Sequence, residues 1–285
     1  MIQGAIQHDI RQGVAMQRTR GRAFLSVAPR RGQNRLIDLF QSGSAKVMLP
    51  SAEGTSPEAI FLNTSGGLTS GDDLHFGMSV GGDGALIAVT QTAERAYLAQ
   101  SGPARLTVRA DVAANARLDW LPQETILFQG ADLLRDTRID LGLGARVVLV
   151  EMIVLGRRAM GEVVSNARMM DRRQVTVRGR PLWMEAQELT PETVARTRTS
   201  AALGPAHVFA TLALCGPGTE AAAEGLQSQP LPDGVTAAAS GWNGRTILRA
   251  TATELWPLKL YLGQMIARLT GRPLPRVWQL QGALA

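Results

Sequence analysis

The sequence has little of what common enzyme and metal sites need. It contains one cysteine, Cys215, and three histidines, His8, His75 and His207. A single cysteine excludes a disulfide framework within the chain and fits a reducing compartment. None of the histidines has a partner at the spacing of a zinc site, and no Gly-x-Ser-x-Gly motif is present. The sequence therefore argues against structural zinc and against common hydrolase chemistry.

Lysine and long apolar runs are also scarce. Lys46 and Lys259 are the only lysines, so arginine carries nearly all the positive charge behind the formal net charge of +6. A high genomic GC content explains this excess without any function, and an acidic protein partner is the functional explanation. Nucleic acid fits less well, because the aromatic residues, 5% of the total, are not interleaved with the arginines. Without an apolar run of membrane-spanning length or an apolar signal core in "MIQGAIQHDIRQG", we expect a cytoplasmic protein with no membrane segment.

Glycine, in contrast, is abundant, with 30 copies, and part of it follows a repeat. The segments "VGGDGALIAV", "DVAANARLDW" and "DLGLGARVVL" align on Ala85, Ala116 and Ala145, at spacings of 31 and 29 residues. In each copy a residue type that accepts positive φ precedes the alanine, and apolar residues stand two and four places after it. These positions are Gly84, Asn115 and Gly144, followed by Ile87 and Val89, Leu118 and Trp120, and Val147 and Leu149.

The repeat predicts units of a strand, a tight turn and a second strand. Stacked units of this length are typical of a layered, solenoid-like β protein. A β-sandwich whose hairpins are alike by chance explains the same pattern, and the period does not separate the two. A weaker fourth copy is "VTVRGRPLWME", with Gly179 as the turn and Leu182 and Met184 after it.

The last third of the chain predicts helices. Thr190 and Pro191 fit the N-cap and first residue of a helix, and "GPGTEAAAEGLQSQPLPDG" fits a surface loop or short helix. Apolar residues between 258 and 269 fit a helix that ends at Gly271, followed by an extended arm, "LPRVWQL". We expect one domain over residues 1–285, with a repetitive β core at about 20–190 and a mixed α/β part at about 190–285.

The stretch "FLNTSGGLTSGDDLHFG", residues 61–77, is the densest in glycine and hydroxyl side chains. It lacks the lysine of a phosphate loop and the glycine spacing of a dinucleotide site. Its glycines, Gly66, Gly67 and Gly71, fit tight turns of the backbone. Asp72 fits either a side chain that closes the loop or one that faces a water-filled path.

Four stretches together resemble the UreD family of urease accessory proteins, also called UreH. They are "LNTSGGLTSGD", "VTQTAERAYLA", "LDWLPQETILFQGA" and "LTGRPLPRVWQL", in the family's order and spacing. The most specific is Trp-Leu-Pro-Gln-Glu-Thr. The resemblance covers nearly the whole chain and implies a mainly β fold, an irregular layered β-helix with a few α-helices, one near the C-terminus.

The resemblance also implies a scaffold and not an enzyme. UreD-like proteins join UreF and the GTPase UreG in a complex that binds apo-urease. Nickel carried by UreG passes through this complex to the urease active site, so the implied metal is nickel in transit, with no tightly bound cofactor. No nucleic acid or membrane partner is implied.

Carboxylates suit weak, exchangeable contact with a divalent cation in transit. The candidates for an internal nickel path are Asp72, Glu124, Glu151, Glu162 and Glu185. Each also has a structural interpretation. Glu151 is the most informative, because it stands in the apolar run "VVLVEMIVLG", where a carboxylate is costly unless it is paired or wet. Arg157 or Arg158 is the expected ionic partner on the structural interpretation.

The candidate partner surface is the C-terminal helix and arm, roughly residues 255–280, with Leu258, Arg276 and Trp278 as contacts for UreF. The alternative is that this helix only covers the β core. Two other functions remain open: a β-solenoid hydrolase acting on polysaccharide, for which five Trp and two Tyr give few stacking residues, and a structural adaptor with no metal path.

Overall fold

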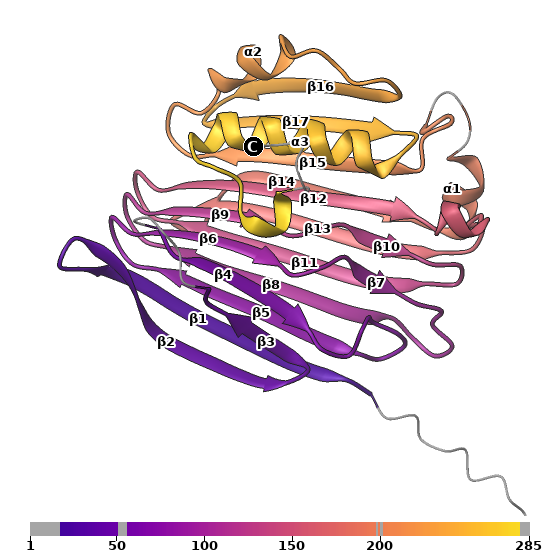
Figure 1. Cartoon of the computed structure of the whole chain (residues 1–285), viewed down its shortest axis with the longest axis horizontal. Coiled ribbons are helices and arrows are strands. Elements are labelled where there is room, and N and C mark those ends of the chain that lie inside the picture. The colour runs from indigo at the N-terminus through magenta and orange to yellow at the C-terminus, as the bar shows by residue number, and fades with distance from the viewer. Residues whose placement is uncertain (1–17, 51–55, 198, 200–201, 280–285) are drawn as a thin grey trace, which may run out of the picture.

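The computed structural model describes residues 18–50, 56–197, 199 and 202–279. Its architecture is two stacked β-sheets with helices at the surface (Figure 1). The chain passes repeatedly from one sheet to the other, so each coil gives one strand to each sheet. This β-solenoid confirms the expectation of a mainly β, layered fold with a few helices. His8, the N-terminal stretch and Leu280 lie outside the described residues.

The first sheet, sheet A, has seven strands. Its inner pairs are parallel and its two outermost pairs are antiparallel. In spatial order the strands are β2 (Gln33–Gly43), β1 (Arg20–Arg30), β5 (Asp73–Val80), β8 (Ala104–Val112), β11 (Asp132–Leu141), β13 (Arg168–Val177) and β14 (Arg180–Leu189).

The second sheet, sheet B, has ten strands. Eight follow one another in the order β3 (Ala45–Met48), β4 (Glu58–Asn63), β6 (Ala85–Thr90), β9 (Arg117–Leu121), β12 (Arg146–Leu155), β15 (Val208–Cys215), β17 (Arg245–Ala252) and β16 (Val235–Trp242). The short strands β7 (Glu94–Ala96) and β10 (Thr125–Leu127) pair with each other, and β10 pairs with β12. Because β12 pairs with β15, sheet B continues across residue 190.

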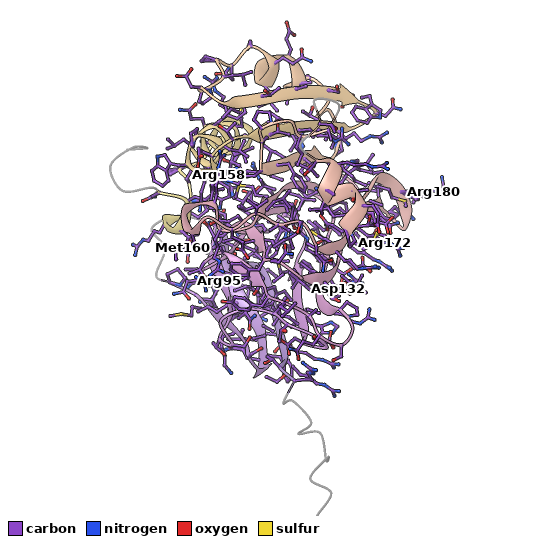
Figure 2. The ribbon with its side chains drawn as sticks, turned by 90° about the vertical axis from the view of Figure 1, so that its right-hand side faces the viewer. Arg95, Asp132, Arg158, Met160, Arg172 and Arg180 are labelled. Carbon is purple, nitrogen blue, oxygen red and sulfur yellow. The ribbon has the colours of Figure 1, made fainter. Side chains whose placement is uncertain are left out.

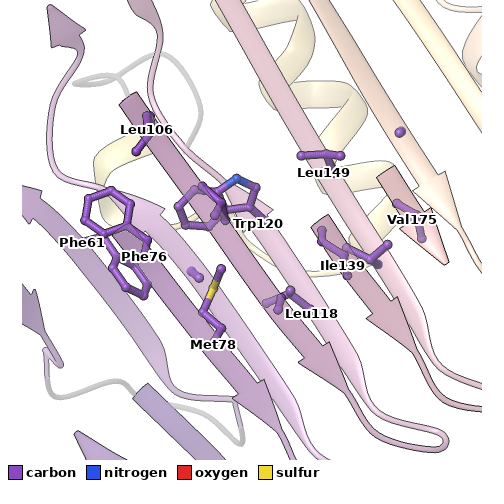
Figure 3. Packing of buried hydrophobic residues seen from close by; sticks show 14 of the residues in the cluster. Phe61, Phe76, Met78, Leu106, Leu118, Trp120, Ile139, Leu149 and Val175 are labelled. Atoms are coloured by element: carbon purple, nitrogen blue, oxygen red, sulfur yellow. The ribbon is translucent and has the colours of Figure 1, made fainter. Parts of the chain in front are cut away.

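The main core lies between the sheets. In β5 the residues Leu74, Phe76, Met78 and Val80 are buried, and the residues that alternate with them are half-buried. This is the period of two expected when one face of a strand meets the core. Phe76 packs with Phe61 and Trp120 at ring-centroid distances of 4.9 and 6.5 Å, and Figure 3 shows this aromatic group beside the aliphatic residues of the later coils.

A second core lies on the outer face of sheet B. The helix α3 (Leu255–Thr270) packs over this face, as Figure 1 shows, and buries a stripe at helical spacing. The stripe consists of Leu258, Tyr261, Leu262, Met265 and Ile266. Strand β12 is therefore covered on both faces, which explains why it is apolar almost throughout, from Val147 to Leu155.

The predicted turns join the sheets as expected, with one correction. Hydrogen bonds close the turns 81–84, 113–116 and 142–145, so Gly84 is equivalent to Ala116 and Ala145. The alignment of the first copy on Ala85 was therefore wrong by one residue, and the positive φ angle falls at Asp83.

The same shift moves the inward-facing pair of the first copy. Leu86 and Ala88 pair with Leu118 and Trp120, which pair in turn with Val147 and Leu149. Ile87 and Val89, the predicted pair, instead contact the second core. The three glycines and one aspartate of this turn all accept tight conformations, so composition alone did not fix the register.

The predicted fourth copy was also wrong. Arg178 and Gly179 both have positive φ angles and connect β13 to β14 as an antiparallel hairpin within sheet A. Such a turn reverses the chain in one sheet and does not cross to the other. Met184 is accordingly 66% exposed, and Trp183 is the buried residue.

The helices follow the sequence signals more closely. Thr190 caps α1 (Pro191–Arg196), with the side chains of Thr190 and Thr193 each bonded to the backbone of the other. The helix α2 (Ala222–Gln227) lies in the predicted surface segment, and α3 ends at Gly271 with φ of 63°. The predicted extended arm is wrong: it forms the 3-10 helix η2 (Arg276–Trp278), because Trp278 turns into the second core.

In the described part of the chain, every helix is too short or too polar to cross a lipid bilayer.

Candidate functional site

The loop after β4 is held by its own side chains. Asn63 accepts hydrogen bonds from the backbone N–H and the hydroxyl of Ser65, at 3.2 and 2.6 Å. Gly67 has φ of 154°, and a Cβ atom there would lie 2.4 Å from Cε2 of Tyr97. Only glycine fits this close approach. The loop is thus a tight turn that packs against the neighbouring coil, as predicted.

Asp72 is buried and closes the same loop. Its Oδ1 accepts from the backbone N–H of Thr19 at 2.7 Å, and its Oδ2 accepts from that of Thr69 at 2.8 Å. Both carboxylate oxygens are therefore engaged by backbone donors. This arrangement favours the structural interpretation of Asp72 over contact with a cation.

Two small cavities lie beside the aromatic group of Phe61, Phe76 and Trp120, in the space between the sheets. The outer cavity, of about 40 Å³, opens among Asn63, Gly66 and Arg95. The inner cavity, of about 20 Å³, is lined by polar groups among apolar ones, notably Gln123, Thr125, Arg135 and Glu151. Both volumes suit one to a few water molecules. The cavities share Phe76, Thr90 and Glu94, so they meet at these residues.

Glu94 lies where the two cavities meet. Its carboxylate accepts from Nδ2 of Asn63 at 3.2 and 3.3 Å and from the backbone N–H of Arg95 at 3.2 Å. Burial raises the pKa of Glu94 to about 7, although these donors and the charge of Arg95 oppose the shift. Glu94 is thus a carboxyl group that faces a polar internal space and changes its protonation near neutral pH.

A buried ionic network begins at the far side of the inner cavity. Oε2 of Glu151 lies 2.5 Å from Nη1 of Arg135, which comes from the opposite sheet. Arg135 also donates to Asp171 at 2.9 and 2.7 Å and to the Thr125 hydroxyl at 3.1 Å. Burial raises the pKa of Glu151 despite Arg135, whereas Arg135 and Arg173 overcome burial and lower the pKa of Asp171.

The network continues to the surface through Arg173. This side chain, itself buried, lies 3.2 Å from both Asp171 and Glu185. Glu185 also accepts from the Thr211 hydroxyl at 3.1 Å and from the exposed Arg249 at 2.6 Å. The network therefore brings two of the five predicted carboxylates, Glu151 and Glu185, into one chain of charges that crosses between the sheets.

The expected ionic partner of Glu151 was wrong. Arg157 and Arg158 follow β12 at an exposed turn, whereas Glu151 points into the space between the sheets. Arg157 instead binds Glu162, through its Nε and backbone N–H, both at 3.0 Å. These bonds, with one from Gln129, outweigh burial and lower the pKa of Glu162. Glu162 thus serves the exposed turn and lies outside the network.

Glu124 also lies apart, under the C-terminal helix. Its Oε2 accepts from Nζ of Lys259 on α3 at 3.0 Å, and both side chains are largely buried. Beside this pair, Nε1 of Trp278 donates to the carbonyl of Leu121 at 2.8 Å. Helix α3 and η2 are therefore fastened to the segment 121–125, whose other side lines the inner cavity.

Of the three predicted contacts for a partner, Leu258 and Trp278 are fully buried in the second core. Arg276 is exposed. On the same helix and turn, Trp256 is 52% exposed and Arg268 is also exposed. The exposed surface of this region thus includes one aromatic and two cationic side chains.

Within the described residues, no three His, Cys, Asp or Glu side chains gather as a metal cluster. The polar groups around the cavities are carboxylates, threonine hydroxyls, side-chain amides and the guanidinium groups of Arg95 and Arg135. Oxygen donors of this kind give a hard dication weak and exchangeable contacts. The side-chain amide nitrogen of Gln123, beside the inner cavity, has no hydrogen-bond partner among the described residues.

Sequence reasoning missed Glu94 and the charged side chains that bind Glu151. A signal for the latter exists, because strand alternation puts Asp171 and Arg173 on the same face as the apolar Met169 and Val175. Arg135 likewise lies on the same face of its strand as the apolar Leu133. Charged residues at core-facing positions predict a buried network, although not which charges meet.

Comparison with known proteins supplies the remaining evidence. A family model described as UreD urease accessory protein matches residues 19–279. The urease accessory protein UreD of Cereibacter sphaeroides is 46% identical over 264 residues, covering 93% of this chain and 96% of that protein. The UreD of Paracoccus denitrificans is 43% identical and covers 94% of each chain, and that of Agrobacterium fabrum is 38% identical and covers 95% of each.

Proposed function

Because the chain belongs to the UreD urease accessory protein family, we propose that it is a non-catalytic scaffold for urease maturation. In this proposal it joins UreF, and through UreF the GTPase UreG, and the complex binds apo-urease. Nickel is cargo in transit and not a resident cofactor. The chain acts as one domain, an interpretation supported by sheet B, which runs without interruption from the solenoid into the C-terminal part.

We further propose that nickel crosses this chain through the two cavities. The observation that carries the proposal is the meeting of the cavities at Glu94, with Glu151 on the wall of the inner one. Carboxylates lie at both stages of this route, and imidazole and thiolate, which hold nickel more tightly, line neither cavity. Because the cavities are small, the cation would pass largely dehydrated or as the side chains move apart.

The other predicted carboxylates differ in how well they fit a nickel path. Glu185 is reached from Glu151 through the ionic network, so it stays a candidate for a branch of the path. Asp72, Glu124 and Glu162 are each satisfied by backbone N–H groups or by a cation. We propose that these three carboxylates stabilise the fold and make at most weak contact with nickel.

The test compares Glu94→Gln and Glu151→Gln with Glu224→Gln, a change on the exposed face of α2. We expect both path variants to assemble with UreF and UreG and to leave apo-urease poor in nickel at limiting nickel concentration. Assembly by co-purification, nickel content by elemental analysis and urease activity are measured on the same samples. Normal nickel content with both path variants would favour the structural adaptor.

We propose that UreF binds the exposed side of α3 and η2. In this arrangement Arg276, Trp256 and Arg268 make the contact, and the buried Leu258 and Trp278 hold the helix from beneath. Truncation at Gly271 would remove Trp278 from the core, so surface substitutions test the interface more cleanly. Trp256→Ala with Arg276→Glu should weaken UreF binding, and Arg172→Glu, on the exposed face of sheet A, should not.

A further inference from the structure

Loops near the outer cavity carry exposed apolar side chains, which do not themselves line the cavity. Tyr97 and Leu98 are 41% and 55% exposed, and Met160 and Val163 are 75% and 59% exposed. Apolar residues of this size rarely gather on a surface that faces only water. We name these four residues, with Arg95, the mouth surface.

Side-chain contacts connect the parts of the mouth surface. The hydroxyl of Tyr97 and Nη1 of Arg95 each donate to the carbonyl of Gly66 at 3.4 Å, on the cavity rim. The Tyr97 ring stacks on Phe128, with centroids 4.8 Å apart and planes at 1°. The guanidinium of Arg157 lies 4.6 Å from the centre of the same Phe128 ring, and its chain leads into the turn that carries Met160 and Val163.

Figure 2 places these parts on one side of the molecule. Arg95, Met160 and Arg158 follow one another along the side of α3, whereas Asp132 and Arg172 lie on the opposite side. Arg158 donates to the carbonyl of Thr253 at 3.1 Å and lies 3.5 Å from Glu254, just before α3. The mouth surface thus extends from the cavity towards the first turn of the C-terminal helix.

The arginines on and beside this surface differ in whether they have an acidic partner. Arg157 has Glu162 as its ionic partner, and Arg158 has Glu254. In the part of the chain that the structure describes, Arg95 makes no ion pair with an acidic side chain at salt-bridge distance, and its guanidinium reaches only a carbonyl. A cation at the rim also opposes the passage of a dication, unless an outside carboxylate neutralises it.

From this arrangement we infer that the mouth surface docks apo-urease, through a patch with an apolar centre and a carboxylate that binds Arg95. The inference rests on the proposed function. UreF is assigned there to α3 and η2, which are fastened to the wall of the inner cavity, so the mouth of the outer cavity is left for the protein that receives the metal. Docking would both seal the mouth with apolar contacts and neutralise the rim cation.

The test measures binding of the full chain to apo-urease and, separately, to the UreF–UreG pair. The variants are Arg95→Glu and Met160→Asp. Their matched controls are Arg172→Glu and Met184→Asp, which change an exposed arginine and an exposed methionine on sheet A. Thermal melting checks that each variant is folded, and all four positions are accessible enough to tolerate a charge.

We expect each mouth variant to bind apo-urease at least tenfold more weakly and to bind UreF–UreG as the wild type does. Added salt should weaken apo-urease binding by the wild type more than by Arg95→Ala, because the ion pair is at a surface. Unchanged binding to apo-urease by both mouth variants overturns the inference and leaves the proposed function intact. A loss of UreF–UreG binding instead also overturns it, since UreF would then occupy the surface.

Failure of the proposed function looks different. In that case the wild-type chain itself binds neither apo-urease nor UreF–UreG, and the variants have no binding to lose.

Discussion

Replacing Glu151 by glutamine should destabilise the protein only moderately, although the residue is buried in an ionic network. Glutamine keeps the shape and can still accept a hydrogen bond from Arg135. Arg135 also keeps its two bonds to Asp171 and its bond to Thr125. In addition, burial raises the pKa of Glu151, so part of its attraction to Arg135 is already offset by desolvation.

The expected cost is therefore that of one charged hydrogen bond, about 1.5–3 kcal/mol. Asp171→Asn should cost more, about 3–5 kcal/mol, because Arg135 loses one of its two bonds to this side chain and both Arg135 and Arg173 lose its negative charge. For a chain of this size each kcal/mol lowers the melting temperature by about 2–4 °C. Glu151→Gln should thus melt a few degrees below the wild type, and Asp171→Asn clearly lower.

The assay is thermal melting followed by circular dichroism, with Glu188→Gln on the exposed face of β14 as the control. An equal or larger loss of melting temperature for Glu151→Gln would refute the reasoning, since Glu151 would then be the main counter-ion of Arg135. The same outcome would also weaken Glu151 as a path residue, because a lack of nickel delivery could follow from unfolding.

Three further outcomes follow from other buried groups. Folding raises the pKa of Glu94 from 4.5 to about 7, so between these pH values the folded state binds a proton that the unfolded state has released. The free energy of unfolding should therefore fall as the pH rises from about 4.5 to 7, and the melting temperature of Glu94→Gln should fall less over this range than that of the wild type. Burial raises the pKa of Cys215 to about 12, so a thiol reagent at pH 8 should label it only after denaturation. Lys259→Met should lower the free energy of unfolding, measured in urea, by about 3–5 kcal/mol, and adding Glu124→Leu should restore part of it, since no unpaired carboxylate then stays buried.

The sequence predicted local features better than contacts between distant segments. The cap at Thr190 and the stop at Gly271 depend on neighbouring residues, and both are confirmed. The turn repeat was found, but its first copy was shifted, because Asp83 and Gly84 both suit a turn. Residues such as Gly179 suit a hairpin as well as a turn between sheets, so the fourth copy could not be distinguished.

The candidate site shows the same limit. The apolar run around Glu151 correctly indicated a buried carboxylate in need of a partner. That partner, Arg135, comes from the other sheet, and only the stacking of the coils brings the two together. Glu94 was missed because its two neighbours in sequence give no sign of burial, and its cavity is formed by three separate segments of the chain. Trp278 was expected at the surface since nothing in the tail shows that it folds back onto Leu121.

The strand order within each sheet has a consequence for how the chain is made. From β4 to β12 in sheet B, and from β5 to β14 in sheet A, each new strand of the main order is added beside the one before it; β5 itself pairs with β1, because β2 lies on the other side of β1. A chain leaving the ribosome can therefore extend both sheets coil by coil, with each finished edge as the template for the next strand. The outer face of sheet B gains its cover only when α3, near the end of the chain, has been synthesised. Until then Val148, Val150 and Met152 face water. A chain truncated before residue 255 should therefore aggregate.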